Sequence, residues 1–187
     1  MEKSQIIATQ RRIRVEPDGF WGPVSDAACK AYLRKIIDQS PNKWPKTDQA
    51  SLTAFYGTPG DESRLINLPV PNGVYYDGEP VKTICCHEKV SESLDRIIRK
   101  LVKEWPNITA HYDGCYNNRK MRGGSLPSLH ARGAAIDFMS SSNGNKDHWP
   151  VVADMPIGVM EIFAAEGWVS AGAFWNRDAM HSQASSL

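Results

Sequence analysis

The sequence of 187 residues lacks an excess of charge of either sign. It carries 22 Lys and Arg against 21 Asp and Glu, for a formal net charge of +1. Nucleic-acid-binding domains usually show a clustered basic excess, so we expect no nucleic-acid partner. The chain has no apolar run of membrane-spanning length and no apolar signal-peptide segment near its N-terminus. We therefore expect a protein that is made in the cytoplasm and does not insert into a membrane.

The chain also lacks a C-x-x-C pair, which argues against a structural zinc knuckle. Its four cysteines are few and scattered. Because disulfides are rare in proteins made in the cytoplasm, we expect free thiols that pack as small hydrophobic side chains. The cysteines are Cys29, Cys85, Cys86 and Cys115.

Two familiar catalytic motifs are incomplete. Residues 123–127 lack the final glycine of the G-x-S-x-G serine-hydrolase motif, and His87-Glu88 is followed by Ser91 where H-E-x-x-H needs its second histidine. We therefore expect His87 to start a helix and not to bind metal. A cysteine peptidase that pairs His130 with one of the thiols remains an alternative; Cys85, Cys86 and Cys115 would be its nucleophiles.

What the chain does have is a run of small residues between an imidazole and a carboxylate, from His130 to Asp137. A catalytic zinc site usually has three protein ligands and leaves the fourth position open. Near the C-terminus, His181 offers a third ligand, and Asp178 precedes it as a spare carboxylate. This pattern predicts a metal site formed by His130, Asp137 and His181.

The two segments together resemble a known family. Ser-x-His-x-x-Gly-x-Ala-x-Asp over residues 128–137, followed by Asp-x-x-His over 178–181 after a tryptophan, is similar to the zinc D,D-carboxypeptidase and L-alanyl-D-glutamate endopeptidase family. That family includes VanY-like enzymes and phage endolysins. The resemblance runs from about Phe55 to the end of the chain.

The resemblance implies roles for individual residues. It implies one Zn²⁺ per chain on His130, Asp137 and His181, with Asp178 as the general base. Glu161 and Glu166 are the next candidates for that base. An upstream arginine would bind the substrate and stabilise the oxyanion, with Arg119 the better match and Arg122 the second. Ser128 would orient the site or contact the substrate.

The sequence of residues 1–39 predicts two short helices. The first spans Gln5–Ile13, and the second has Pro23 at its first position. The Asp-Gly turn between them resembles that of a peptidoglycan-binding module, although the segment is shorter than usual. The alternative is a helical hairpin that packs on the main domain. We expect a linker over residues 40–54 and the catalytic domain over 55–187.

The catalytic domain should be α+β: a small antiparallel sheet that carries the zinc site, flanked by helices. Strands are expected at Val81–Cys86, Ile108–Tyr112, Gly133–Met139 and Trp168–Phe174. Helices are expected over His87–Trp105, which Pro106 ends, and between Pro156 and Gly167.

The function that follows is hydrolysis of an amide bond in the stem peptide of bacterial peptidoglycan, most simply the L-Ala–D-Glu bond, by a monomeric endolysin. Without a signal peptide, such an enzyme reaches the wall from the host cytoplasm after a holin opens the membrane. The runner-up is a D-Ala-D-Ala carboxypeptidase. The alternative of another class is a non-catalytic cell-wall-binding or virion structural protein.

Overall fold

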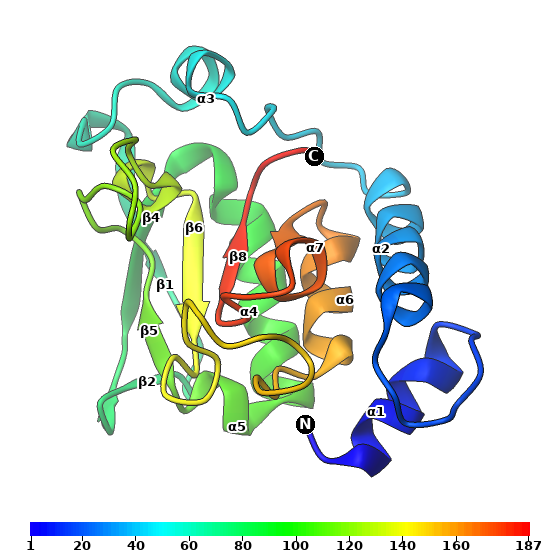
Figure 1. The fold of residues 1–187 in the computed structure, drawn as a ribbon. Helices are drawn as coiled ribbons and strands as arrows, with labels where there is room; N and C mark the ends of the chain where they lie inside the picture. The colour runs from blue at the N-terminus through cyan, green and yellow to red at the C-terminus, as the bar shows by residue number, and fades with distance from the viewer.

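A computed structural model describes residues 1–187, and they form an α+β fold around a four-stranded antiparallel sheet (Figure 1). The strand order is β5-β6-β8-β7, so that the two middle strands are β6 and β8. The strands are β5 (Tyr112–Gly114), β6 (Ala135–Phe138), β7 (Val169–Ser170) and β8 (His181–Gln183). This sheet confirms the expected fold class and the expected central strand around Asp137.

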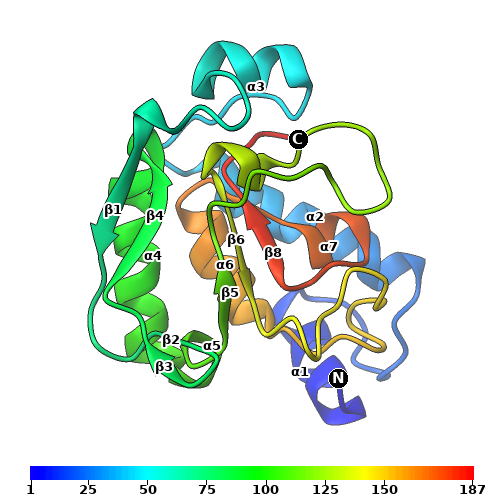
Figure 2. The same cartoon turned by 90° about the vertical axis from the view of Figure 1, so that its left-hand side faces the viewer.

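Two smaller antiparallel pairs flank the sheet. Figure 2 shows the pair of β1 and β4 lying along helix α4. The second pair joins β2 to β3, beside β5. The bounds are β1 (Leu65–Pro69), β2 (Tyr75–Tyr76), β3 (Glu79–Pro80) and β4 (Thr83–His87).

Seven α-helices and three 3₁₀ turns complete the fold. The helices are α1 (Lys3–Arg12), α2 (Pro23–Asp38), α3 (Gln49–Tyr56), α4 (Ser91–Glu104), α5 (Pro106–Thr109), α6 (Ile157–Ala165) and α7 (Ala171–Trp175). The turns are η1 (Glu62–Arg64), η2 (Glu88–Val90) and η3 (Leu129–Arg132). No helix has both the length and the apolar character that crossing a membrane requires.

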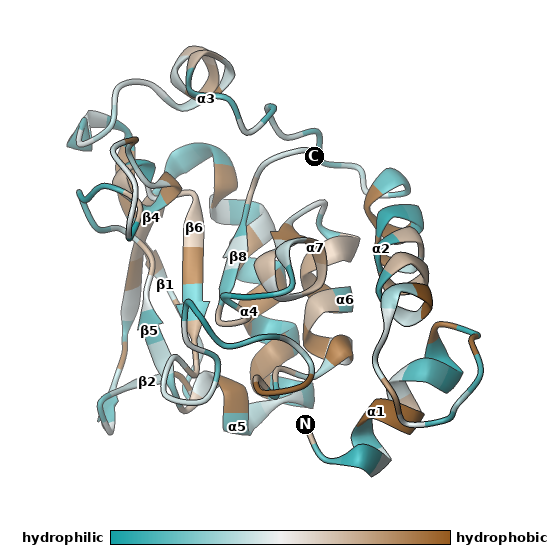
Figure 3. Cartoon of the chain, viewed as in Figure 1, coloured by the Kyte–Doolittle hydropathy of each residue, from teal (hydrophilic) through white to brown (hydrophobic).

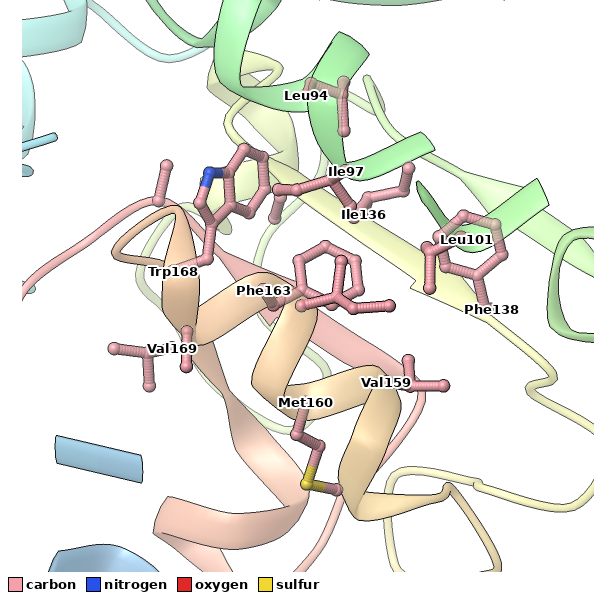
Figure 4. Close-up of a cluster of buried hydrophobic side chains, with 14 of the residues drawn as sticks. Leu94, Ile97, Leu101, Ile136, Phe138, Val159, Met160, Phe163, Trp168 and Val169 are labelled. Carbon is pink, nitrogen blue, oxygen red and sulfur yellow. The ribbon is translucent and has the colours of Figure 1, made fainter. Parts of the chain in front are cut away.

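The core lies between α4, α6 and the sheet. Apolar residues recur on α4 at helical spacing, and Leu94, Ile97 and Leu101 are fully buried there. They pack toward Ile136 of β6 and Phe163 of α6 (Figure 4). Figure 3 shows the hydrophobic colours on β6 and α6 in the interior, with hydrophilic colours over much of the surface. The sheet therefore packs on the core through one face. The alternate side chains of β6 and β8, which point to the opposite face, are not needed for that packing.

The N-terminal helices pack on the α+β domain that the rest of the chain forms. Glu161 of α6 accepts hydrogen bonds from Arg12 of α1 and from the Tyr32 hydroxyl of α2, the latter over 2.8 Å. Trp21 meets Trp149 edge to face, with 5.2 Å between ring centroids. Buried side chains of α2 belong to the same hydrophobic cluster as those of α4 and α6. Residues 1–39 thus share a core with the rest of the chain.

The expected linker over residues 40–54 includes the beginning of a helix. Asp48 caps α3 by accepting a hydrogen bond from the Ser51 N–H over 2.8 Å. Arg132, buried beside the metal motif, donates to Gln49 and Thr53 of the same helix over 3.0 and 2.9 Å. Helix α3 is therefore held against the segment that carries His130.

Two expected strands were wrong. Residues 108–112 were expected to form a strand, but Pro106 takes the first position of α5, and only Tyr112 lies in β5. Residues 168–174 were expected to form the last strand, but they form the short β7 and most of α7, and the last strand is β8 at His181. In both places apolar content was mistaken for a strand pattern, because short apolar runs do not distinguish strand from buried helix.

The shared core predicts how α2 contributes to stability. Leu33 of α2 is 1% exposed. The substitution Leu33→Ala should lower the free energy of unfolding by about 2–4 kcal/mol, since the surrounding side chains cannot fill the cavity that it leaves. In this variant, thermal unfolding and urea unfolding should each remain a single transition, with a lower midpoint than in the wild type. Val24→Ala on the same helix is the matched control, because Val24 is 75% exposed. A separate early transition that leaves the rest of the chain folded would show that residues 1–39 are an independent unit.

Candidate functional site

Three side chains predicted from sequence meet at the sheet. His130 Nε2 lies 3.1 Å from Asp137 Oδ1 and 3.1 Å from His181 Nδ1. Asp137 Oδ1 lies 2.9 Å from His181 Nδ1. All three residues are buried, and each turns one ligand atom to a common point. The structure therefore brings together the whole predicted ligand set.

The outer nitrogens of both imidazoles have partners of their own. His130 Nδ1 lies 2.6 Å from the Cys115 carbonyl oxygen, and His181 Nε2 lies 3.0 Å from Gln183 Oε1. The Gln183 amide nitrogen donates to Ser185 Oγ over 2.6 Å, which fixes that amide with its oxygen toward His181. Both acceptors need an N–H, so each neutral ring keeps its proton on the outer nitrogen.

It follows that three lone pairs face one another. His130 Nε2, His181 Nδ1 and Asp137 Oδ1 are all acceptors in that state, and none can donate to another. Such a buried cluster is stable only around a cation or with an extra proton. The donor set of two imidazoles and one carboxylate, each ring steadied by an outer hydrogen bond, fits a divalent transition metal. The residues present can hold such an ion.

His130 is placed by its local turn. Ser128 caps η3 by accepting a hydrogen bond from the His130 N–H over 3.3 Å, so its hydroxyl orients the backbone of the ligand. Gly133 ends the turn with φ +64°, and a Cβ there would lie 2.8 Å from the backbone nitrogen of His87. That nitrogen donates to the Gly133 carbonyl over 2.9 Å. The small residues after His130 therefore allow the end of β4 to approach closely.

Asp137 and His181 are placed by strand pairing. They are direct partners across β6 and β8, so their side chains leave the same face of the sheet side by side. Register cannot slip by one residue without turning both side chains to the other face. Sheet formation alone thus creates two of the three ligand positions.

Ionisation of the cluster follows from burial and from its hydrogen bonds. Burial disfavours the Asp137 carboxylate, yet when His130 or His181 carries an extra proton, the hydrogen bond that the ring donates outweighs burial and holds the pKa of Asp137 well below its usual range. Burial lowers the pKa of His181, but the adjacent Asp137 reverses this and leaves that pKa raised. The Asp137 carboxylate is therefore charged, and it attracts a proton or a metal ion to the same place.

Asp178 sits next to this cluster in a constrained turn. It has φ +59°, a left-handed conformation that aspartate adopts only with some strain, and its carbonyl accepts from the His181 N–H over 2.9 Å. Its Oδ1 is buried and has no hydrogen-bond partner. Burial raises the pKa of Asp178, an effect that nearby His181 only partly offsets. An unpaired carboxylate oxygen of raised basicity is suited to accepting a proton.

Two adjoining hollows open beside the cluster, with volumes of about 170 and 330 Å³. Arg119, Arg122 and Asp137 line both hollows. Arg119 Nη2 lies 4.0 Å from Asp137 Oδ2, the oxygen that faces away from the histidines. Asp178 and His181 line the smaller hollow, and His130 lines the larger. Every residue that the sequence assigned to the site therefore borders this cleft or supports it.

Two reserve candidates for the base lie elsewhere. Glu161 is bound to Arg12 and Tyr32, and Glu166 is bound to Arg96 by two hydrogen bonds of 2.9 Å. Neither lines the two hollows.

The cysteine alternative lacks an activated thiol. The Cys115 thiol donates to the Gly133 carbonyl over 3.6 Å, and burial raises the pKa of Cys115 well above its usual value. A catalytic thiol requires the opposite shift. All four cysteines are free, as expected, although Cys85 is only half-buried.

Sequence reasoning missed Gln183, and it noted the tryptophan at 175 only as part of the motif, without a place at the site. Gln183 could have been found, because residues two apart on a strand share a face and Gln183 follows His181 by that spacing. The Trp175 ring stacks near His181, with 6.3 Å between centroids and 30° between planes, and it lines the smaller hollow. The role of the Cys115 carbonyl could not be predicted from the sequence, because every residue has a backbone carbonyl.

We compared the chain with protein-family models, with curated proteins and with solved structures, and none of the three comparisons found a match.

Proposed function

We propose that the protein is a zinc peptidase that hydrolyses an amide bond in the stem peptide of bacterial peptidoglycan, the L-Ala–D-Glu bond being the first candidate. The observation that carries this proposal is the convergence of three lone pairs on one point beside an unpaired buried carboxylate. Support also comes from the order of the two motifs along the chain. Release from the cytoplasm to the wall by a holin belongs to the same proposal.

Zinc bound by His130, Asp137 and His181 would polarise the scissile carbonyl and lower the pKa of the attacking water toward about 7. The chain's own residues then have separate tasks. Asp178 accepts the proton of the water and passes it to the leaving amine, because its free oxygen has no other partner. Arg119, beside the outer oxygen of Asp137, offers charge for a developing oxyanion. Arg122 and Ser128 border the space where the peptide would lie.

Two alternatives predict different products. A D-Ala-D-Ala carboxypeptidase would use the same residues, and a terminal carboxylate would then meet Arg119 or Arg122. A non-catalytic wall-binding or virion protein would use the ion for stability alone. Against this last alternative stands the cleft, since structural zinc sites are normally closed by a fourth ligand.

The substrate is tested by mass spectrometry of the products formed from a defined muropeptide. A new N-terminal D-Glu supports the endopeptidase, and release of free D-Ala supports the carboxypeptidase. An intact muropeptide after prolonged incubation with zinc-loaded protein would exclude both.

The first prediction concerns the metal. Elemental analysis should find about one zinc per chain, and His130→Ala should lose most of it, because two ligands rarely retain the ion. Two imidazoles and a carboxylate also suit Fe²⁺, so iron is measured on the same sample. His111→Ala is the control, since His111 lies outside the cluster. An unchanged zinc content in His130→Ala would show that His130 is not a zinc ligand.

The second prediction concerns Asp178. Asp178→Asn should keep zinc and the fold, because all three ligands remain, but turnover should fall by about 100-fold or more. Zinc content and turnover are measured on one preparation. Loss of zinc would make Asp178 a ligand, and near-normal turnover would exclude it as the base.

The third prediction separates metal from thiol chemistry. A chelator should abolish cleavage and added zinc should restore it, because a three-ligand site exchanges its ion. Alkylation of accessible cysteines should leave most activity, since the buried thiols are protonated. The reverse pattern, with sensitivity to alkylation alone, would favour a cysteine peptidase.

A further inference from the structure

A large cavity lies away from the cluster of His130, Asp137 and His181. It has a volume of about 740 Å³ and opens between α1, the C-terminal end of α4 and the beginning of α6. Figure 1 shows these elements at one end of the molecule, around the chain's N-terminus. None of its lining residues borders the two hollows at the metal cluster. A volume of this size falls within the range of about 300–1,000 Å³ typical of small-molecule sites.

Trp105 forms a rigid apolar wall of this cavity. Its backbone joins α4 to α5, just before Pro106. Its ring leans on α6 at Gly158, where an added Cβ would lie 2.6 Å from Trp105 Cζ2. The Trp105 indole N–H has no partner within the protein and is not buried, whereas those of Trp149 and Trp168 are bound. The ring therefore combines a fixed apolar surface with a free donor.

The charged side chains around the cavity cancel, since Arg11, Arg12 and Lys100 are matched by Glu104, Asp154 and Glu161, and the N-terminal residue Met1 also lines it. Arg12 and Glu161 neutralise each other at its edge. Arg11, Lys100 and Glu104 line it without any ion pair, and they offer donors and an acceptor of both signs. Binding of a polyanion would require a clear excess of basic side chains in the lining. A purely apolar ligand would leave the charged side chains of the lining without partners. The lining favours a neutral ligand that has an apolar face and a polar rim.

A pyranose ring has that character, since its C–H groups form an apolar face and its hydroxyl and acetamido groups form a rim. We infer that this cavity binds the glycan strand of peptidoglycan, with one N-acetylated sugar against Trp105 and its polar groups toward Arg11, Lys100 and Glu104. The inference rests on the proposed function, because the metal cluster would cut peptides attached to the same strand. The metal cluster and the sugar site would then hold the polymer at two places.

The inference is tested on the full chain by calorimetry with a soluble β-1,4-linked N-acetylglucosamine oligomer and with glycan strands stripped of peptide. Wild-type protein should bind both. Trp105→Ala should weaken binding by about tenfold or more, equal to about 1.4 kcal/mol. Because Trp105 also packs on the core, the double variant Arg11→Ala/Lys100→Ala serves as a second test at two exposed positions. It should weaken binding several-fold without change in thermal unfolding.

Lys103→Ala is the matched control, since Lys103 is exposed on α4 but does not line the cavity. Absence of binding by wild-type protein would overturn the inference. So would equal binding by wild type and both cavity variants, or stronger binding of a soluble polyphosphate than of the oligomer.

Hydrolysis separates this inference from the proposed function. A soluble stem peptide that carries no sugar is assayed beside intact wall fragments. If the cavity binds glycan, the double variant should slow cleavage of wall fragments several-fold and should cut the soluble peptide at the wild-type rate. If wild-type protein binds the oligomer but cuts neither substrate, the proposed function fails and the sugar site remains. If both substrates are cut but no glycan binds, only the inference fails.

Discussion

The site depends on one arrangement: three acceptor atoms held near 3 Å from one another in a buried place, with no donor among them. Like partial charges at that distance repel, so the surrounding fold must supply the force that holds them. Strand pairing holds Asp137 and His181, and a capped turn holds His130. The outer hydrogen bonds of the two rings then prevent the rings from turning away. Stability of the sheet and affinity of the site for a cation are therefore linked.

The surrounding residues divide into those that hold the cluster and those that stay free. Ser128 accepts a hydrogen bond from the His130 N–H, Gln183 pairs with the outer nitrogen of His181, and Gly133 allows the end of β4 to approach. Asp178 differs, because one oxygen is buried and unpaired in a strained turn. Strain and unsatisfied polar groups cost free energy, and they persist most often where function requires them. This contrast is the reason why we propose a chemical role for Asp178 and a positioning role for the others.

The sequence predicted which three side chains converge, because each of them lies in a short pattern. His130 and Asp137 are separated by small residues, and Asp178 precedes His181 by one turn. The fold class and the central strand were also predicted, the strand as residues 133–139, and the structure forms β6 within that range. Residues 168–174 were misassigned because their apolar side chains fit both a strand and a buried helix. The Cys115 carbonyl, the Glu161 ion pair with Arg12 and the cavity at Trp105 could not be predicted, since each joins segments distant in the chain.

The order of strands also has a consequence for how the molecule assembles. Strand β8 is the last strand in the chain, yet it lies between β6 and β7, and no bond joins those two without it. His130 and His181 are separated by 51 residues, so their contact is non-local and forms slowly. A nascent or partly unfolded chain can therefore form the His130 turn and β6 while the third ligand is still absent. The sheet and the candidate cation site both lack a member until β8 pairs with β6 and β7, so a bound ion would report that the chain has reached its native topology.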